Sequence, residues 1–342
     1  MKKVINVSRY TDTKVLRFTV EFVTPCFLGG ADGNAELRVA PFKNLLRRWW
    51  RVVNGSLTPE ELWKRESELF GSTEKMPGTK NNVFGKSKVI LSIVDSTKVQ
   101  YSSSEFDIEK AHKGKIPVNV GLYLGYGAVT NKGTRSYIKS GSRCEFEIRV
   151  SSKYVKELEK TLFYINLFGT IGSKSKNGFG SISILYKFNP QECWPICQDI
   201  NKILDNGKNY PNAIVKDSNG ILCWATNDYK SWEDAIKKLC DVYLEVGSWM
   251  KEEGGKNNWR NLFGYAEVDK RLPSQVILKI SKKCTTGKEG FLYYGIIIHI
   301  PYVVSNWKTG LKDFREASIY LDKCFDSENL KGCYGRKTGG SN

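Results

Sequence analysis

The chain has 342 residues and a formal net charge of +17, with 53 Lys and Arg against 36 Asp and Glu, and it contains 9 Trp, 17 Tyr and 16 Phe. This charge attracts polyanions and the rings can stack on bases, so we expect RNA or single-stranded nucleic acid as a partner. No apolar run approaches the roughly 18 residues of a membrane-spanning helix, and residues 1–6 lack an apolar signal core, so we expect a cytoplasmic protein that contacts no membrane.

The first predicted elements are a strand over residues 15–23, where apolar and polar residues alternate, and a helix over residues 41–51. The helix carries Lys43, Arg47 and Arg51 on one face, with Trp50 beside them. Such a face suits a phosphate backbone with a base stacked nearby. An ordinary amphipathic helix with a solvated basic face is the alternative. The apolar stripe on the other face consists of Phe42, Leu45, Leu46, Trp49 and Val53.

Four further elements follow in the first half of the chain. Strands are predicted at residues 89–94, 143–150 and 181–188, and a helix at residues 155–168. The resulting order is strand, helix, strand, strand, helix, strand, which is the ferredoxin-like order also used by RNA-recognition modules. The fold class we predict is therefore α+β with antiparallel sheets.

A glycine-rich segment, residues 169–180, lies between the second helix and the last strand of this half. Ser173, Lys174 and Lys176 supply hydroxyl and ammonium donors for phosphate groups. The segment is neither a Walker A loop nor a Rossmann fingerprint, because it follows a helix instead of opening one. Since the carboxyl end of a helix repels anions, the lysines must provide the attraction. A flexible surface loop is the alternative to a phosphate-binding loop.

We place a domain boundary at Asn189–Pro190, giving an N-terminal domain of residues 1–190 and a C-terminal domain of residues 191–342. Strands are predicted in the second half at residues 221–225, 276–280 and 296–300, and helices at 232–246 and 312–325. We interpret this half as a degenerate ferredoxin-like domain. The Gly- and Lys-rich tail, residues 331–342, is expected to be frayed.

Cysteine and histidine usage argues against a metal site or histidine-based catalysis. The chain has nine cysteines, of which only Cys193 and Cys197 are close in sequence, and no second pair or histidine accompanies them. The two histidines, His112 and His299, are far apart. We therefore expect no metal, no cofactor and no catalytic residue.

Several short motifs of the first half occur together in one known family. They are TPCFLGG at 24–30, ELR at 36–38, the cationic helix with WWR at 49–51, LFGS at 69–72 and GFG at 178–180. Together they resemble the RAMP superfamily of CRISPR proteins and, within it, subunit one of the Cmr complex, the type III-B RNA-targeting effector of antiviral defence. The similarity covers residues 15–188.

The resemblance implies two ferredoxin-like domains that bind RNA and cut nothing themselves. In such complexes the guide CRISPR RNA runs along a stack of RAMP subunits, and subunit one lies where the 3′ part of the guide emerges. The implied partners are guide RNA, target RNA and other Cmr subunits of the ribonucleoprotein. The RNA-contacting positions carried over are Lys43, Arg47, Arg48, Trp50, Arg51, Ser173, Lys174 and Lys176.

Three positions depart from the family pattern: Pro41 replaces serine, Asn44 replaces glycine, and Asn177 replaces a basic residue in the loop.

Two other functions stay open. One is a metal-independent RAMP endoribonuclease that processes repeat RNA, for which residues 121–141 offer a glycine-rich segment. The candidate residues of this glycine-rich segment are Tyr126, Lys132, Tyr137 and Lys139. The other function is a nucleic-acid-binding module unrelated to CRISPR.

Overall fold

The computed structural model describes residues 12–72, 85–193, 197–205, 213–267, 270–285, 290–302, 311–334 and 336–337. The prediction for residues 1–6 lies outside this part of the chain, as do residues 338–342 of the tail. No helix of the described residues is long and apolar enough to cross a membrane.

The first half is built on one antiparallel sheet with the strand order β10-β1-β9-β2. Helix α1 joins β1 to the segment leading to β2, and α4 joins β9 to β10, so the predicted order of elements is confirmed. The bounds are β1 Thr13–Phe22, α1 Val39–Val53, α2 Pro59–Phe70, β2 Ile90–Asp95, β9 Arg143–Ser151, a 3-10 turn Ser152–Tyr154, α4 Val155–Phe168 and β10 Ile182–Leu185. Strand β10 is shorter than the predicted 181–188.

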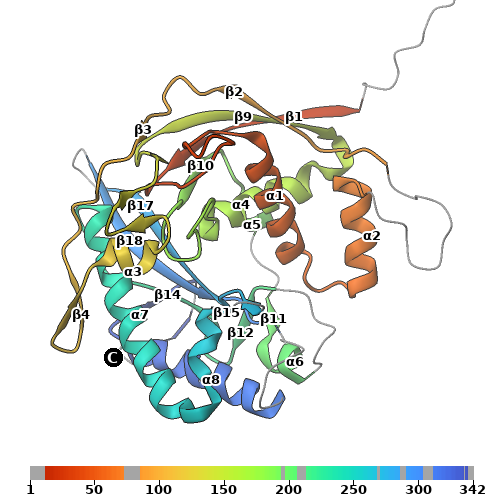
Figure 1. The fold of residues 1–342 in the computed structure, drawn as a ribbon. Helices are drawn as coiled ribbons and strands as arrows, with labels where there is room; N and C mark the ends of the chain where they lie inside the picture. The colour runs from red at the N-terminus through yellow and green to blue at the C-terminus, as the bar shows by residue number, and fades with distance from the viewer. Residues whose placement is uncertain are drawn as a thin grey trace, which may run out of the picture.

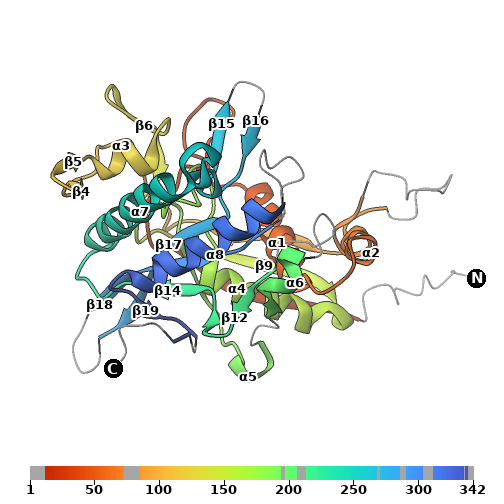
Figure 2. The same cartoon turned by 90° about the horizontal axis from the view of Figure 1, so that it is seen from below.

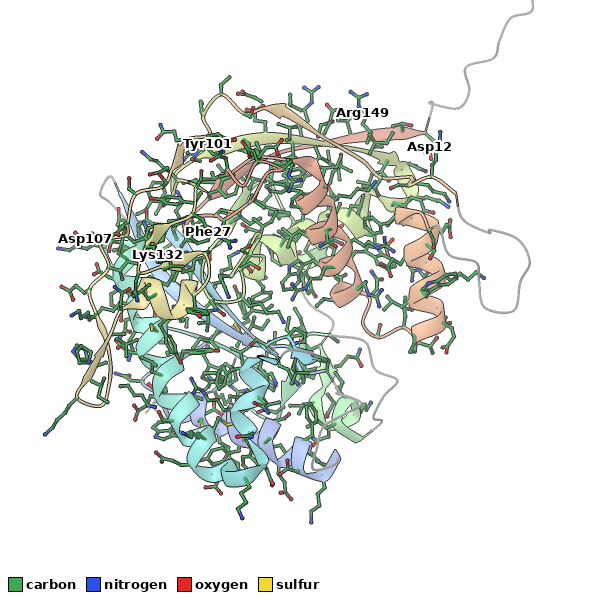
Figure 3. All side chains as sticks on the ribbon, in the orientation of Figure 1. Asp12, Phe27, Tyr101, Asp107, Lys132 and Arg149 are labelled. Carbon is green, nitrogen blue, oxygen red and sulfur yellow. The ribbon has the colours of Figure 1, made fainter. Side chains whose placement is uncertain are left out.

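Apolar and polar residues alternate along β1 and β9, and this alternation determines which face of the sheet is buried. The buried residues are Leu16, Phe18, Val20, Phe22, Cys144, Phe146, Ile148 and Val150. They lie under α1 and α4, which cover this face together (Figure 1). The residues between them point away from the helices, as Arg149 does on the outer face (Figure 3).

Helix α2 begins at a capping box that the sequence carries. The Thr58 hydroxyl accepts from the Glu61 backbone N–H, and the Glu61 carboxylate accepts from the Thr58 backbone N–H, so two otherwise unpaired donors of the first turn are satisfied. The helix then packs beside α1, with Leu62, Leu69 and Phe70 buried. This contact has consequences for the cationic face of α1.

Short elements fill the segment between β2 and β9. They are β3 Tyr101–Ser102, β4 Ala111–Lys113, β5 Ile116–Val118, α3 Val120–Gly125, β6 Val129–Thr130, β7 Gly133–Thr134 and β8 Tyr137–Ile138. The segment packs on helix α7 (Trp232–Gly254) of the second half, and its apolar residues Val120, Leu124 and Val129 belong to the core around α7. It thus ties the two halves together.

The second half repeats the connectivity of the first. Its main sheet has the order β17-β18-β14-β19, with α7 between β14 and β17 and α8 between β18 and β19. The bounds are β14 Cys223–Ala225, α7 Trp232–Gly254, β17 Val276–Cys284, β18 Phe291–His299, α8 Leu311–Ser327 and β19 Lys331–Gly332. The predicted strands and helices of this half are confirmed, although α7 continues for two more turns.

Smaller elements complete the second half. They are α5 Pro190–Cys193, β11 Gln198–Asp199, α6 Ile200–Asp205, β12 Val215–Asp217, β13 Gly220–Ile221, the 3-10 turns Gly255–Asn257 and Trp259–Phe263, β15 Tyr265–Glu267 and β16 Lys270–Leu272. Helix α5 contacts α4, which Figure 2 shows beside it, whereas α6 packs on β11 and β12. The boundary at Asn189–Pro190 stays a prediction.

The second sheet is buried on both faces. Figure 1 shows its strands between the layer of α1 and α4 and the layer of α7 and α8. Ile277 and Ile298 therefore join the core under α1 and α4, whereas Leu278 and Ile297 join the core around α7. Burial on both faces explains why 276–280 and 296–300 are continuous apolar runs.

The prediction of a frayed tail is wrong for residues 331–334, 336 and 337. Strand β19 pairs with β14, and Arg336 is buried. Its guanidinium donates to Asp217 and Asp326 and lies 4.6 Å from the ring centre of Trp224. Two carboxylates and an aromatic face order this segment, and two of these groups, Asp217 and Trp224, are remote in sequence.

Candidate functional site

The two features singled out by the sequence, the cationic helix and the glycine-rich segment, meet at one groove. The groove has a volume of 450 Å³ and is lined by α1 on one side and by residues 170–173 and Ser175 on the other, with residues 27–29 between them. We call it the α1 groove. It joins the TPCFLGG motif, the helix and the loop in one surface.

The face of α1 that lines this groove is Pro41, Asn44 and Arg48. These residues are spaced i, i+3, i+7, so they form one ridge of the helix. Two of them are positions at which the chain departs from the family pattern. Of the four predicted basic contacts on the helix, Arg48 alone lines the groove. The i, i+4, i+8 spacing of Lys43, Arg47 and Arg51 favoured another face of the helix, although the i, i+3, i+7 spacing of Pro41, Asn44 and Arg48 also marks a ridge.

The glycine-rich segment is held to the TPCFLGG motif by backbone hydrogen bonds. Ser173 N–H donates to the Phe27 carbonyl over 2.9 Å, and Gly180 N–H donates to the Pro25 carbonyl over 2.8 Å. The Thr24 hydroxyl donates to the Gly178 carbonyl over 2.8 Å. The segment is therefore anchored at both ends, which argues against the flexible-loop alternative.

Two glycines allow this close approach. Gly180 has a φ of 63°, and a Cβ there would lie 1.8 Å from the Ile171 carbonyl oxygen. Gly172 has a φ of 92°, and a Cβ there would lie 2.7 Å from the Phe27 carbonyl oxygen. Because only glycine fits these positions without strain, the loop backbone lies directly against Phe27 at Gly172, and the two ends of the loop lie against each other at Gly180.

Three cations belong to the α1 groove or its edge. Lys174 is exposed and has a φ of 58°, in the left-handed region. Arg48 is half-buried, and this burial lowers the pKa of its guanidinium, which nevertheless stays a cation. Lys176 turns inward and donates to the Ser274 carbonyl. Burial, aided by the nearby Arg48 charge, lowers the pKa of Lys176 to about 7.

A lysine of the second half offsets the partial negative charge at the carboxyl end of α4, which precedes the loop. The buried Lys279 of β17 donates to the Asn166 carbonyl over 2.6 Å and to the Ile165 carbonyl over 3.2 Å. Burial lowers its pKa to about 7. Since these carbonyls are occupied, the repulsion of anions that we expected from this helix end is weakened.

The predicted face Lys43, Arg47 and Arg51 points elsewhere. Arg47 and Arg51 both form ion pairs with the buried carboxylate of Glu66 on α2. Their side chains are 43% and 48% exposed, so each guanidinium keeps access to solvent on one side. This face is an α1–α2 contact as well as a cationic surface.

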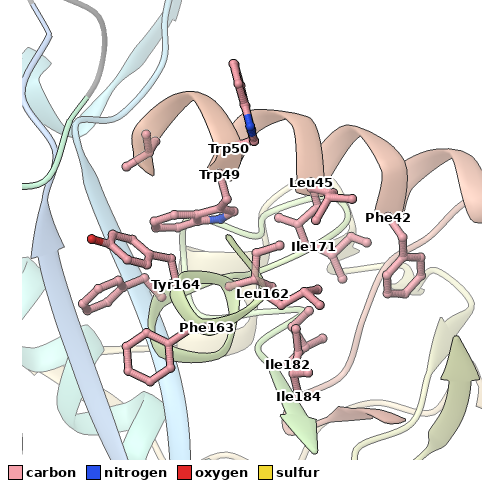
Figure 4. Close-up of a cluster of buried hydrophobic side chains, with 14 of the residues drawn as sticks. Phe42, Leu45, Trp49, Trp50, Leu162, Phe163, Tyr164, Ile171, Ile182 and Ile184 are labelled. Atoms are coloured by element: carbon pink, nitrogen blue, oxygen red, sulfur yellow. The ribbon is translucent and has the colours of Figure 1, made fainter. Parts of the chain in front are cut away.

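The prediction that Trp50 stacks on RNA is wrong. Trp50 is 1% exposed and packs edge-on against Phe70 of α2, with 5.9 Å between ring centres. Figure 4 shows Trp49 and Trp50 on opposite sides of α1, with Trp49 pointing toward α4. Because α2 covers the second side, the helix buries two faces instead of one. The buried indole N–H of Trp50 has no hydrogen-bond acceptor within the described residues.

The candidate residues for an endoribonuclease do not form a common surface site. Tyr137 is buried among Phe27 and Phe106, and its hydroxyl donates to the Ser104 carbonyl over 3.2 Å. Tyr126, in contrast, is 75% exposed. Lys132 and Lys139 are exposed too. Tyr137 is therefore a core residue and not a candidate for proton transfer at a surface.

The histidines are also apart. His299 is buried in β18, with Nδ1 2.8 Å from an Asp322 carboxylate oxygen. His112 is exposed on β4. Among the residues the structure describes, no group of three or more His, Cys, Asp or Glu side chains is arranged to hold a metal ion.

Residues 19–183 match the family model of the RAMP superfamily. Among solved structures, the chain is similar to Cmr1 from Pyrococcus furiosus in its apo crystal form, with 14% identity, 93% of this chain and 98% of that chain covered, and a TM-score of 0.48. It is also similar to a chain of the type III-B Cmr-beta complex in a cryo-EM structure with cognate target RNA, with 13% identity, 91% and 100% covered, and a TM-score of 0.48. No curated protein matches it.

Proposed function

Because the segment from residue 19 to residue 183 belongs to the RAMP superfamily, we propose that this chain is a non-catalytic, RNA-binding subunit of a type III-B CRISPR (Cmr) effector complex. In this role it contacts the 3′ region of the guide RNA and the target RNA through their backbones. Its two halves, which share one connectivity, are then two ferredoxin-like domains of the RAMP type.

The observation that carries the proposal is the α1 groove. Arg48 lines it from the helix and Ser173 from the loop opposite, and the exposed Lys174 follows Ser173 at the edge of the groove. Cationic groups and small hydroxyl donors on two facing walls suit the phosphates of a single strand. Asn44 adds an exposed amide on the helix wall. Among the carried-over positions, the groove thus favours Arg48, Ser173 and Lys174.

Backbone contacts of this kind carry no sequence information. They suit a subunit that must accept any guide and any target. The net charge of +17 adds long-range attraction for the strand. Guide RNA, target RNA and neighbouring RAMP subunits are therefore the partners we assign.

Co-purification and a cleavage assay test the proposal together. The tagged protein is recovered from cells and should bring processed guide RNA and other RAMP proteins with it. The purified protein is then incubated with guide-like and target-like single-stranded RNA, with and without Mg²⁺. We expect binding without cleavage, and loss of target binding by the complex when this subunit is omitted.

Site-specific cleavage that disappears in Tyr126→Phe, His112→Ala or Lys139→Ala would overturn the non-catalytic assignment. These three side chains are exposed, so their substitution leaves the core intact. Failure to recover any guide RNA or RAMP protein would overturn the assignment to a complex.

A further inference from the structure

A second basic groove, far from the α1 groove, lies at the other end of α4. It has a volume of 680 Å³ and is bordered by the carboxyl end of α1, by α2, by the first turns of α4 and by the segment after β10. We call it the Tyr186 groove. None of the carried-over RNA contacts lies in it.

Five cations line this groove, and three of them have acidic neighbours. Arg65 pairs with Glu157 over 3.0 Å, and Lys156 with Glu192 over 3.6 Å. Lys153 lies 3.4 Å from Glu68. The third carboxylate of the groove, Glu159, accepts the Tyr186 hydroxyl.

Two lysines remain without an acidic partner within the described part of the chain, Lys160 on α4 and Lys187 after β10. Lys187 is exposed and Lys160 is half-buried. The groove as a whole has five cations against the three carboxylates of Glu157, Glu159 and Glu192, so its lining keeps a net positive charge. An anion in the groove could pair with these two ammonium groups without displacing a carboxylate.

Aromatic rings lie between the cations. Tyr186 and Phe188 flank Lys187 and are both half-buried, with ring centres 5.1 Å apart. The hydrogen bond to Glu159 fixes the tyrosine ring from its far end. Fixed rings beside unpaired lysines are the combination that binds single-stranded nucleic acid, since bases stack while phosphates pair.

The two grooves mark the two ends of one helix. The α1 groove includes Thr170 and Ile171, just after α4 ends, whereas the Tyr186 groove includes the first turns of α4. The helix has 14 residues, so its ends are about 20 Å apart at 1.5 Å per residue. A single strand several nucleotides long would reach from one groove to the other.

We propose that the Tyr186 groove is a second contact site for single-stranded RNA, used by strands long enough to leave the α1 groove and reach the far end of α4. The proposal rests on the proposed RNA-binding function but involves different residues. Lys160 and Lys187 contact phosphates, and Tyr186 and Phe188 offer faces to a base.

The test compares two lengths of RNA by fluorescence anisotropy, about 5 and about 20 nucleotides. The variant is Lys160→Glu/Lys187→Glu, and Lys160→Gln/Lys187→Gln serves as a second variant that adds no carboxylate beside Glu157 and Glu159. The matched control is Lys113→Glu/Lys115→Glu, which makes the same charge change on the exposed turn between β4 and β5.

For the long RNA, we expect the charge-reversed variant to bind about tenfold more weakly and its salt slope to fall by about 1.4, two contacts at about 0.7 each. The short RNA should bind to it as to the control. Equal affinity of variant and control for the long RNA would overturn the inference.

The outcomes separate this inference from the function it rests on. If Arg48→Ala/Lys174→Ala abolishes RNA binding and the Tyr186-groove variants do not alter it, the proposed function stands and the second site is wrong. If the Tyr186-groove variants keep their RNA affinity but no longer recover a partner subunit, the groove binds an acidic protein surface instead. If the wild-type protein binds neither RNA, both proposals fall.

Discussion

Trp49 and Trp50 are adjacent in sequence, yet they fill opposite sides of α1. Trp49 stacks on Phe168 of α4 with 6.0 Å between ring centres, and Trp50 meets Phe70 of α2. Both are at most 2% exposed. We therefore expect Trp49→Ala and Trp50→Ala each to lower the free energy of unfolding by about 3–5 kcal/mol, measured by denaturant titration. A Trp50→Ala protein of wild-type stability with weakened RNA binding would restore the stacking hypothesis.

The ion pairs of Glu66 give a second prediction. Removing Arg47 and Arg51 together leaves a buried carboxylate without a counter-charge, which should lower the free energy of unfolding by about 3–5 kcal/mol. Glu66→Ala leaves two half-exposed guanidinium groups that water can reach, so we expect a smaller loss of about 1–3 kcal/mol.

The triple variant closes this cycle. Arg47→Ala/Arg51→Ala/Glu66→Ala should be more stable than the double arginine variant, because no buried charge is left unpaired. Equal stability of the double and triple variants would show that Glu66 is not held by these arginines.

The lowered pKa of the buried Lys279 makes the free energy of unfolding depend on pH. Its pKa is about 7 in the folded protein and near 10.5 when the chain is unfolded. Between these values the unfolded chain binds more protons, so the free energy of unfolding rises with pH. Lys279→Met should reduce that rise between about pH 7 and about pH 10, measured by denaturant unfolding. An unchanged slope would mean that Lys279 titrates normally in the fold.

The glycine-rich loop offers a fourth prediction with an internal control. Gly180 and Gly127 both have positive φ, but a Cβ at Gly127 meets no atom within 4 Å, whereas one at Gly180 meets the Ile171 carbonyl. Gly127→Ala should lower the free energy of unfolding by about 1 kcal/mol through backbone strain alone. Gly180→Ala should lower it further and weaken RNA binding. Similar effects of the two variants would show that the loop does not need the close approach of Gly180 to the Ile171 carbonyl.

The sequence predicted those elements whose pattern is local. The alternation along β1 and β9 and the 3.6-residue period of α4 identified their buried residues, because one face of each element meets the core. Adjacent pairing of these strands then followed from the order of elements. The glycine-rich loop was also located correctly, since glycine spacing is a local signal.

The contacts that the sequence did not predict are made between distant segments. Trp50 looked exposed because the helix was considered with one apolar stripe, and α2, which buries the other side, was not predicted. Arg336 looked mobile because Asp217 and Trp224 lie more than a hundred residues away. The choice of Arg48 over its neighbours likewise depends on which ridge of α1 faces the loop.

If RNA lies in the α1 groove, the salt dependence of RNA binding must depend on Arg48 and Lys174. Affinity for a single-stranded RNA is measured over a range of salt concentrations for the wild type, for Arg48→Ala/Lys174→Ala and for the charge-matched control Lys113→Ala/Lys115→Ala. We expect the groove variant to lose affinity and its slope to fall by about 1.4, while the control keeps the wild-type slope. A wild-type slope in the groove variant would contradict this placement of the RNA.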